Sequence, residues 1–276
     1  SFPVAEKGYL RRPDGSLDLP EAAGGSSLYR FVAAGLAVRK AAGLPGLTLL
    51  SCDNLAGNGA VLRRLMRDYL AAYHPDLSAW FDSECRCPAT MIDRIVPATT
   101  EADRADVEAV LGVRDEGAVV TEAFSQWVIE DDFAGPRPRW DEVGAELVTD
   151  VAPYETAKLR MLNGAHSALA YIGLGEGHAF VHQAIADPAV RPVIERLMRD
   201  EAAPTIDAAP GQDLTAYADA LLGRFANPAL DHRLIQIAMD GSQKIPQRWL
   251  ETLAWHQARG ASCPSLEVAI AAWIAF

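Results

Sequence analysis

Four polar side chains share one face of a helix that the sequence predicts from Pro153 onward. Proline suits a first helical turn, and Glu155 stands where the helix dipole favours an acid. At about 100° per residue around the helix axis, with Lys158 set to zero, Glu155 lies at about 60°. His166 lies at about 80° and Asn163 at about 140°. A lysine, an amide and an imidazole on one face could take a proton from a hydroxyl group and stabilise charge on its oxygen.

A solvated helix face is the alternative interpretation of the same spacing. An ordinary pair between Glu155 and Lys158 at i, i+3 would contribute only tenths of a kcal/mol. Spacing alone leaves both interpretations open.

A second motif overlaps this helix. Tyr154 and Lys158 form Y-x-x-x-K, the pair with which short-chain dehydrogenases protonate a carbonyl. Tyr154 follows Pro153 directly at a helix start, and no strand of the chain leads into G-x-G-x-x-G, the loop that binds a pyrophosphate. The glycines of Gly173–Gly177 have a different spacing and lie in a helical region. We therefore expect Tyr154 to pack the helix start.

Metal chemistry has little support in the sequence. Cys85 and Cys87 form a lone C-x-C, and His178 and His182 at i, i+4 have no third ligand nearby in the chain. We therefore predict no metal site. Two further histidines, His74 and His256, are interpreted as helix-end or surface residues, and Trp127, Trp140 and Trp249 as packing residues.

The elements that must position these residues change character along the chain. The first 150 residues alternate β-rich and helical patterns, with strands predicted at Leu47–Cys52, Ile92–Val96 and Gln126–Ile129 and a helix at Gly57–Tyr73. This alternation predicts an α/β layer. From Pro153 onward the pattern is entirely helical.

Short breaks divide the helical half into segments. They lie at Asp187-Pro188, Ala203-Pro204, Ala209-Pro210-Gly211 and Asn227-Pro228. Composition breaks at residues 135–138 and 150–153 place the domain boundary near residue 150. We predict one domain over residues 1–150 and a second over residues 151–276.

Composition excludes several classes of partner. The 276 residues carry a net charge of -12, which opposes non-specific nucleic-acid binding. The longest apolar runs, Ser167–Leu174 and Val268–Phe276, are well short of the roughly 20 residues that span a bilayer. Four irregularly spaced cysteines fit a reducing compartment. We expect a cytoplasmic protein with no membrane or nucleic-acid partner.

The helix at Pro153 also carries a family resemblance. The stretches Asp150–Glu155 and Lys158–Ser167 resemble the signature helix of the long-chain mannitol dehydrogenase and fructuronate reductase family. Further blocks resemble the same family in the same order: Glu6–Tyr9, Ser51–Leu55 with Asn58-Gly59, Met91–Ile95, Gln126–Asp131 and Asp240–Lys244. Members of that family are longer and begin with a nucleotide-binding half that this chain lacks.

The resemblance implies a fold and a set of roles. Residues 1–150 would be the remainder of a Rossmann-like domain, residues 151–276 a mainly helical domain, and the cofactor NAD or NADP. Lys158 would be the general base, Asn54 and Asn163 an oxyanion-stabilising pair, and His166 a hydrogen-bonding partner of the substrate. Asn54 would also contact the cofactor. Glu155, Asp93 and Lys244 would line the same pocket.

The physical chemistry agrees with these roles. Hydride removal from a secondary alcohol requires a base for the hydroxyl proton and donors for the developing charge. A lysine serves as that base only where burial or a nearby cation lowers its pKa from about 10.4.

Substrate choice is the least determined part of this hypothesis. Polyol dehydrogenases of the family carry an arginine where this chain has Gln236, and the run from His232 to Asp240 resembles the uronate-reducing branch. A sugar acid such as mannonate, oxidised reversibly to fructuronate, needs a cation for its carboxylate, which Arg233 or Lys244 could supply. Mannitol is the second candidate, and an inactive remnant acting as a binding module is the third. The oligomeric state stays open.

Overall fold

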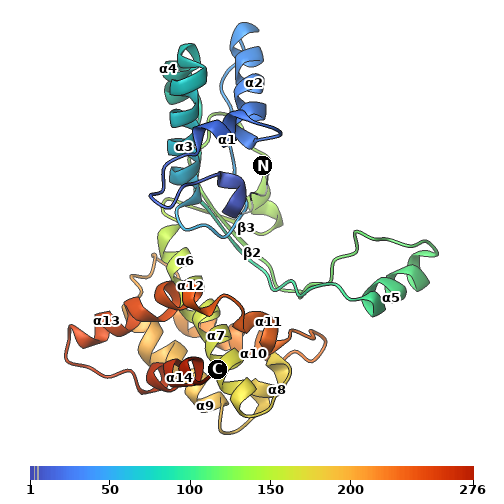
Figure 1. The fold of residues 1–276 in the computed structure, drawn as a ribbon, viewed down its shortest axis with the longest axis vertical. Coiled ribbons are helices and arrows are strands. Elements are labelled where there is room, and N and C mark those ends of the chain that lie inside the picture. Colours follow the sequence, from blue (N-terminus) through green and yellow to red (C-terminus); the bar gives the residue numbers. More distant parts are fainter. Residues whose placement is uncertain (3, 5) are drawn as a thin grey trace. The chain divides into compact units, whose positions relative to one another are not determined.

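The computed structural model describes residues 1–2, 4 and 6–276, which form two compact units (Figure 1). The first unit comprises Ser1–Asp93 and Gln126–Ala152, and the second comprises Arg94–Ser125 and Pro153–Phe276. Residues 94–125, which lie before the predicted boundary near residue 150, therefore pack with the helical residues. The assignment of domain roles to residues 1–150 and 151–276 stays a prediction.

A mixed three-stranded sheet forms part of the first unit. Its strands are β1 (Thr90–Asp93), β2 (Gln126–Glu130) and β3 (Ala145–Val148), in the order β1-β2-β3. β1 pairs antiparallel with β2, and β2 pairs parallel with β3. Val128 and Ile129 of β2 are fully buried, as an apolar run in a central strand requires. The strand predicted at Gln126–Ile129 is confirmed.

Two other strand predictions need correction. The run Leu47–Cys52 is extended, but it forms only isolated bridges, from Thr48 to Arg86 and from Ser51 to Phe2. The neighbouring segments are paired with it over too short a length to make a ladder. The strand predicted at Ile92–Val96 lies earlier, because β1 ends at Asp93 and the chain leaves the sheet there.

Helices pack around the core of the first unit. They are η1 (Glu6–Tyr9), α1 (Leu19–Ala23), α2 (Leu28–Ala41), α3 (Asn58–Tyr73), α4 (Pro75–Glu84) and η2 (Trp140–Val143). On α3 the residues Leu62, Leu65, Met66 and Leu70 are fully buried, at the i, i+3, i+4 and i+8 spacing of an amphipathic helix. The predicted helix Gly57–Tyr73 is confirmed, and Gly57 is its N-cap, with a left-handed φ of 61°.

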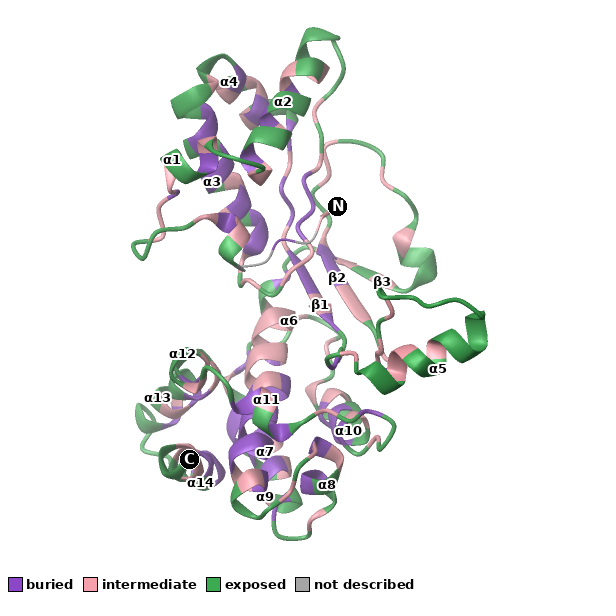
Figure 2. Ribbon diagram, turned by 45° about the vertical axis from the view of Figure 1, so that its right-hand side comes forward, coloured by how far each residue is buried: buried purple, intermediate pink, exposed green. Residues whose placement is uncertain are grey.

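The second unit is mainly helical after Ala152, as predicted. Its elements from there on are α6 (Ala152–Ala157, whose first residue belongs to the first unit), η3 (Lys158–Asn163), α7 (Gly164–Gly175), α8 (Val181–Ala186), α9 (Arg191–Arg196), η4 (Leu197–Ala202), η5 (Ala203–Thr205), α10 (Leu214–Phe225), α11 (Leu234–Ala238), α12 (Gly241–Ile245), η6 (Pro246–Leu250), α13 (Glu251–Gln257) and α14 (Pro264–Ala275). Most of α7 is buried, and α11, α14 and α8 pack against it (Figure 2). This helix is the centre of the unit's core.

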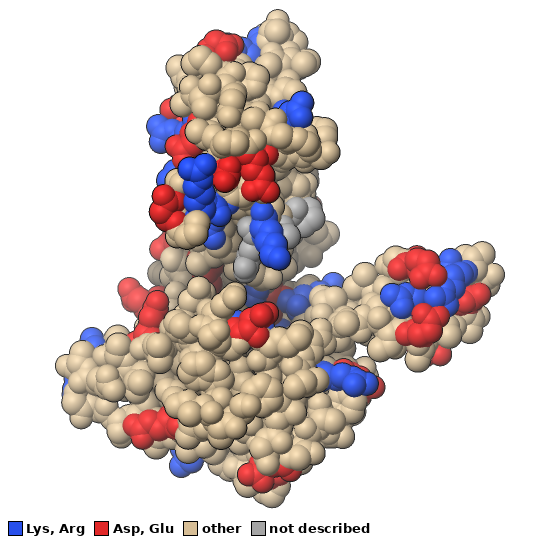
Figure 3. Space-filling model, in the orientation of Figure 1, with Lys and Arg blue, Asp and Glu red and all other residues tan. Residues whose placement is uncertain are grey.

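Residues 94–125 form an arm of the second unit. Its helix α5 (Glu101–Leu111) begins with a capping box between Thr100 and Asp103 and has no buried residue. Acidic and basic side chains lie close together on the arm, as Figure 3 shows, and they pair with one another, for example Arg114 with Glu101 at 2.6 Å. Among the residues that the structure describes, none of the helices has the length and apolar character needed to cross a bilayer.

Candidate active site

The helix that begins beside Pro153 changes its hydrogen-bond pattern at Lys158. Asp150 accepts from the Ala152 N–H at 2.9 Å, which caps the start of α6. From Lys158 to Asn163 the helix is a π-helix, and α7 continues it from Gly164. The Gly164 N–H donates to the carbonyl of Leu159, five residues earlier. A π-turn inside an α-helix often occurs at a functional site.

This turn corrects the angular positions expected from a uniform α-helix. In a π-turn the backbone hydrogen bond joins residues five apart, so Lys158 and Asn163 lie on successive turns of the same side. The separation of about 140° that an α-helix would give them is therefore wrong. His166 is three residues further along α7, within about 60° of Asn163. Lys158 and Asn163 are half-buried, and His166 is buried.

His166 lies in a buried aromatic environment. Its ring is 4.7 Å from the Phe225 ring and 5.3 Å from the His232 ring, measured between centroids. The side chain is 7 % exposed, and its Nε2 atom has no hydrogen-bond partner among the described residues. A buried nitrogen without a partner is unusual in a folded protein and is consistent with a site that a ligand completes.

Burial also sets the protonation state of His166. Desolvation holds the pKa of His166 well below its usual value, and His232, Arg248 and Arg224 lower it further. Burial lowers the pKa of His232 as well. His166 is therefore neutral near pH 7 and can donate or accept a hydrogen bond without carrying charge.

A second helix holds the π-turn in place from the side. Arg248 donates from Nη1 to the Asn163 carbonyl at 3.3 Å and to the Ser167 hydroxyl at 2.7 Å. The next residue, the fully buried Trp249, donates from Nε1 to the Gly164 carbonyl at 3.0 Å. Both belong to η6, which is also a π-turn. The packing role predicted for Trp249 is confirmed.

The third π-turn, η4, completes this arrangement. η3 packs against both η4 and η6. Arg160 of η3 donates to the carbonyl and hydroxyl of Thr205 at 2.7 and 2.9 Å, just beyond η4, and to Glu251 at 2.8 Å. Within η4, the buried Glu201 carboxylate accepts from two N–H groups at the start of α14. The three π-turns of the described residues therefore share one cross-bonded region.

In the first unit, a polar network fixes the loop that carries Asn54. The Asp53 carboxylate accepts from the Tyr9 hydroxyl at 2.5 Å and from the Leu55 N–H at 2.9 Å, and Ser51 bonds to the same group. Burial and the neighbouring carboxylate raise the pKa of Tyr9, so its hydroxyl stays protonated. Asn54 itself is exposed on this loop.

The same network reaches the sheet through Asn58. Asn58 exchanges hydrogen bonds with the backbone of Thr90, donating at 3.1 Å and accepting at 2.9 Å. The next residue, Gly59, has no room for a side chain, because an added Cβ would lie 2.4 Å from the Cys87 carbonyl. These contacts explain why Asn58-Gly59 follows the loop: the start of α3 packs directly on the backbone before β1.

The other predicted site residues occupy varied positions. Asp93 is buried at the end of β1, Glu155 is half-buried on α6, and Arg233 is exposed, with its guanidinium 5.8 Å from the Phe180 ring. Lys244 donates to the Met239 carbonyl at 2.6 Å. The structure brings Lys158, Asn163 and His166 together on one helix. Asn54 and Asp93 belong to the first unit, and their part in a common site is a proposal.

Sequence reasoning missed three residues around His166. Arg248 and Phe225 were not singled out, and His232 was noted only as a neighbour of Arg233. Arg248 stands four residues after Lys244, which is helical spacing, so the block that ends at Lys244 contained a signal for it. Phe225 carries no such signal, because its contact with His166 arises only in the folded chain.

The histidine pair takes part in other contacts. His178 pairs with Asp187 at 2.8 Å, and the His182 ring stacks on the Phe180 ring. No group of three or more His, Cys, Asp or Glu side chains among the described residues could hold a metal ion. His256 lies in the last turn of α13, which confirms the helix-end interpretation, and its side chain is buried and bonds to the Glu201 carbonyl.

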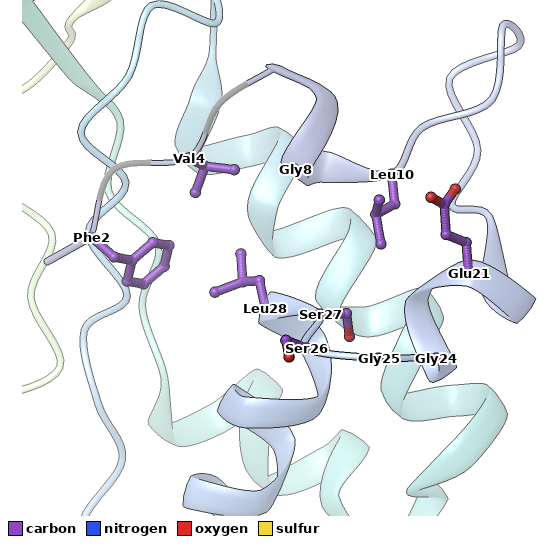
Figure 4. A pocket seen from close by; sticks show the side chains of 10 residues that line it. All are labelled: Phe2, Val4, Gly8, Leu10, Glu21, Gly24, Gly25, Ser26, Ser27 and Leu28. Carbon is purple, nitrogen blue, oxygen red and sulfur yellow. The ribbon is translucent and has the colours of Figure 1, made fainter.

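A hollow in the first unit contains none of the predicted site residues. It has a volume of about 610 Å³ and lies beside the start of α2. Figure 4 shows Phe2, Val4 and Leu28 turned toward one another in it, with Glu21 at its edge. Its described lining is mainly apolar, with Glu21, Ser26 and Ser27 as the polar side chains, and it is separate from the helix that carries Lys158.

The fold is that of a two-part chain, with a Rossmann-like domain followed by a helical domain. Residues 6–142 match the mannitol dehydrogenase Rossmann domain, and residues 150–276 match the mannitol dehydrogenase C-terminal domain. The chain belongs to the mannitol dehydrogenase family. Both the predicted fold class and the family resemblance are confirmed.

Individual relatives show how far the similarity extends. D-mannonate oxidoreductase of Escherichia coli is 42% identical over all of this chain and 59% of its own length. A crystal structure of D-sorbitol dehydrogenase aligns with a TM-score of 0.90 at 32% identity, over 97% of this chain and 57% of that one. Mannitol 2-dehydrogenase of Pseudomonas fluorescens, in a ternary complex with NAD and D-mannitol, aligns with a TM-score of 0.81 at 36% identity, over 97% and 56%. The chain thus spans somewhat more than half the length of these relatives.

Proposed function

We propose that this protein is an oxidoreductase that transfers a hydride between a nicotinamide cofactor and a sugar acid of the D-mannonate/D-fructuronate type. The observation that carries the proposal is the π-turn, which places Lys158 and Asn163 on successive turns of one side, beside the buried His166. Similarity to D-mannonate oxidoreductase supports the choice of substrate class.

Each side chain has one task in the reaction. Lys158 takes the hydroxyl proton of the substrate as the carbon loses a hydride and becomes a ketone. The Asn163 amide donates to the same oxygen and stabilises its negative charge without adding a charge of its own. Neutral His166 hydrogen-bonds a neighbouring hydroxyl group and orients the substrate.

The cofactor supplies the hydride acceptor in this reaction. Asn54 stands on a fixed loop between an extended segment and the start of α3, the position where α/β proteins bind nucleotides. The Asn54 amide is suited to contact the nicotinamide end of NAD or NADP. The chain has no G-x-G-x-x-G loop for the phosphates. Asn54 would hold the reactive end of the cofactor and serve as the second oxyanion donor.

The substrate pocket needs a cation for the carboxylate of a sugar acid. Arg233, at the N-cap of α11, and Lys244, on α12, are the candidates, and Gln236 stands where polyol dehydrogenases have an arginine. Glu155 and Asp93 would bind substrate hydroxyl groups. Mannitol is the second candidate substrate, since mannitol 2-dehydrogenase is similar over 97% of this chain.

Steady-state oxidation by the purified full-length protein tests the proposal. D-mannonate and D-mannitol are compared with NAD and with NADP by the absorbance of the reduced cofactor, with Lys158→Ala as the control. Turnover of mannonate that requires Lys158 is expected. Faster turnover of mannitol would move the protein to the second candidate, and no turnover of either would favour the inactive remnant.

A further inference from the structure

Arg248 contacts the candidate active site from a different helix. Its guanidinium joins the Asn163 carbonyl, at the end of the π-turn, to the Ser167 hydroxyl, one turn into α7. Trp249 binds the next carbonyl along, that of Gly164. Two consecutive residues of η6 therefore bind two consecutive carbonyls where the π-turn changes into an α-helix.

We propose that Arg248 is a positioning residue for the reaction, which fixes the turn that carries Asn163 and places a permanent positive charge beside His166. The inference rests on the proposed function, because it assigns Arg248 to the same site. Arg248 need not touch the substrate. It acts through Asn163, Ser167 and His166.

Two hydrogen bonds from Arg248 limit the movement of Asn163. Asn163 and Ser167 are four residues apart, so one guanidinium spans the last π-helical residue and the first full turn of α7. An amide that stabilises an oxyanion must be held at hydrogen-bond distance from it, and a misplacement of about 1 Å can cost about 10²-fold in rate. A bond to the Asn163 backbone limits such movement.

The electrostatic part follows from the groups that face His166. They are the Phe225 and His232 rings and the charges of Arg224 and Arg248. Arg224 forms a two-bond ion pair with Glu122, which offsets its charge. No carboxylate of the described residues pairs with Arg248, whose own pKa is lowered by desolvation. Arg248 is thus the unbalanced charge that acts on His166, in the direction that keeps its ring neutral.

Three variants of the full-length protein test these two parts. Arg248→Met removes the charge and both hydrogen bonds, and Arg248→Lys keeps the charge alone. Arg160→Met is the matched control, since Arg160 also ties η3 to neighbouring segments but is not among the groups that shift His166. The readouts are kcat, KM and the titration of His166, followed by NMR with labelled histidine and assigned with His166→Gln.

The proposal gives a distinct result for each variant. Arg248→Met should lower kcat by roughly 10- to 100-fold, with a smaller change in KM, and should raise the pKa of His166. Arg248→Lys should restore the His166 titration and only part of kcat. Arg160→Met should lower stability, lower kcat by clearly less than Arg248→Met does, and leave the His166 titration unchanged.

Contrary results are equally specific. Wild-type values of kcat and of the His166 titration in Arg248→Met would overturn the proposal. Equal effects from Arg160→Met would reduce Arg248 to a general structural role. Absence of turnover in the wild-type protein would refute the proposed function, and the His166 titration would still decide whether Arg248 sets its charge state.

Discussion

Replacing Arg224 with methionine would break the buried ion pair that attaches the arm to the helical unit. Arg224 donates from Nε and Nη2 to the two carboxylate oxygens of Glu122 at 3.0 and 2.7 Å. The two side chains are 7 % and 3 % exposed. Glu122 also accepts from the Ile95 N–H at 2.6 Å. Removing one partner of such a pair leaves a desolvated charge and costs about 3–5 kcal/mol.

The expected loss of stability can be measured at the arm and for the whole unit. Hydrogen exchange of the Ile95 amide reports opening of the arm, and denaturant unfolding reports the free energy of the whole unit. Glu122→Gln should lower stability by a similar amount, and the double variant by clearly less than the sum, because it removes both charges. Arg191→Met is the control, since its pair with Glu195 is 46 % and 35 % exposed and should contribute about 0.5 kcal/mol or less.

Two results would refute this reasoning. A loss below about 1 kcal/mol in Arg224→Met would mean that water reaches the carboxylate and replaces the arginine. Strict additivity in the double variant would mean that Arg224 and Glu122 stabilise the unit through separate contacts.

Four further outcomes are expected. Lys158→Ala should lower kcat by roughly 10²- to 10⁴-fold, partly restored by a small amine, whereas Tyr154→Phe should be mild; the reverse pattern in kcat would favour the short-chain mechanism. Gly59→Ala should lower the free energy of unfolding by more than about 1 kcal/mol, because its Cβ meets the Cys87 carbonyl, and denaturant midpoints measure this. Below about pH 6.5 the free energy of unfolding should fall by up to about 1.4 kcal/mol per pH unit, because His166 binds a proton in the unfolded chain but not in its buried position in the folded chain. Denaturation at a series of pH values measures this slope, and His166→Asn should flatten it. Activity should survive a strong chelator, and a loss of turnover restored by zinc would contradict the metal-independent mechanism.

Local patterns predicted the elements whose own residues determine them. The helix α3 and strand β2 follow from amphipathic spacing and an apolar run, and the helical half follows from proline and glycine breaks between periodic segments. Ala203-Pro204 is an exception, since these residues continue the helix as a 3₁₀ turn. β3 was missed because its four residues include Glu146 and show no alternation of their own.

Features that depend on distant partners were not predictable in this way. The extended run Leu47–Cys52 was recognised, but its pairing depends on Phe2 and Arg86. For the candidate site, the sequence predicted Lys158 and Asn163 on one helix, but not the π-turn between them. Lysine, leucine, arginine and methionine, which make up most of that turn, are good α-helix formers, so their types do not indicate a π-turn. Contacts from η6, some 85 residues further along the chain, accompany the change.

The π-turn at Lys158–Asn163 also has a consequence for comparing and redesigning chains of this family. A π-turn holds more residues than an α-helical turn, so deleting a single residue between Lys158 and Asn163 could leave an unbroken α-helix of nearly the same length. Lys158 and Asn163 would then be four residues apart in an α-helix, within about 40° of one another, so they would stay on the same side of the helix. A one-residue gap here in an alignment would therefore mark the loss of the π-turn, with the lysine and the asparagine still facing the same way where both are retained.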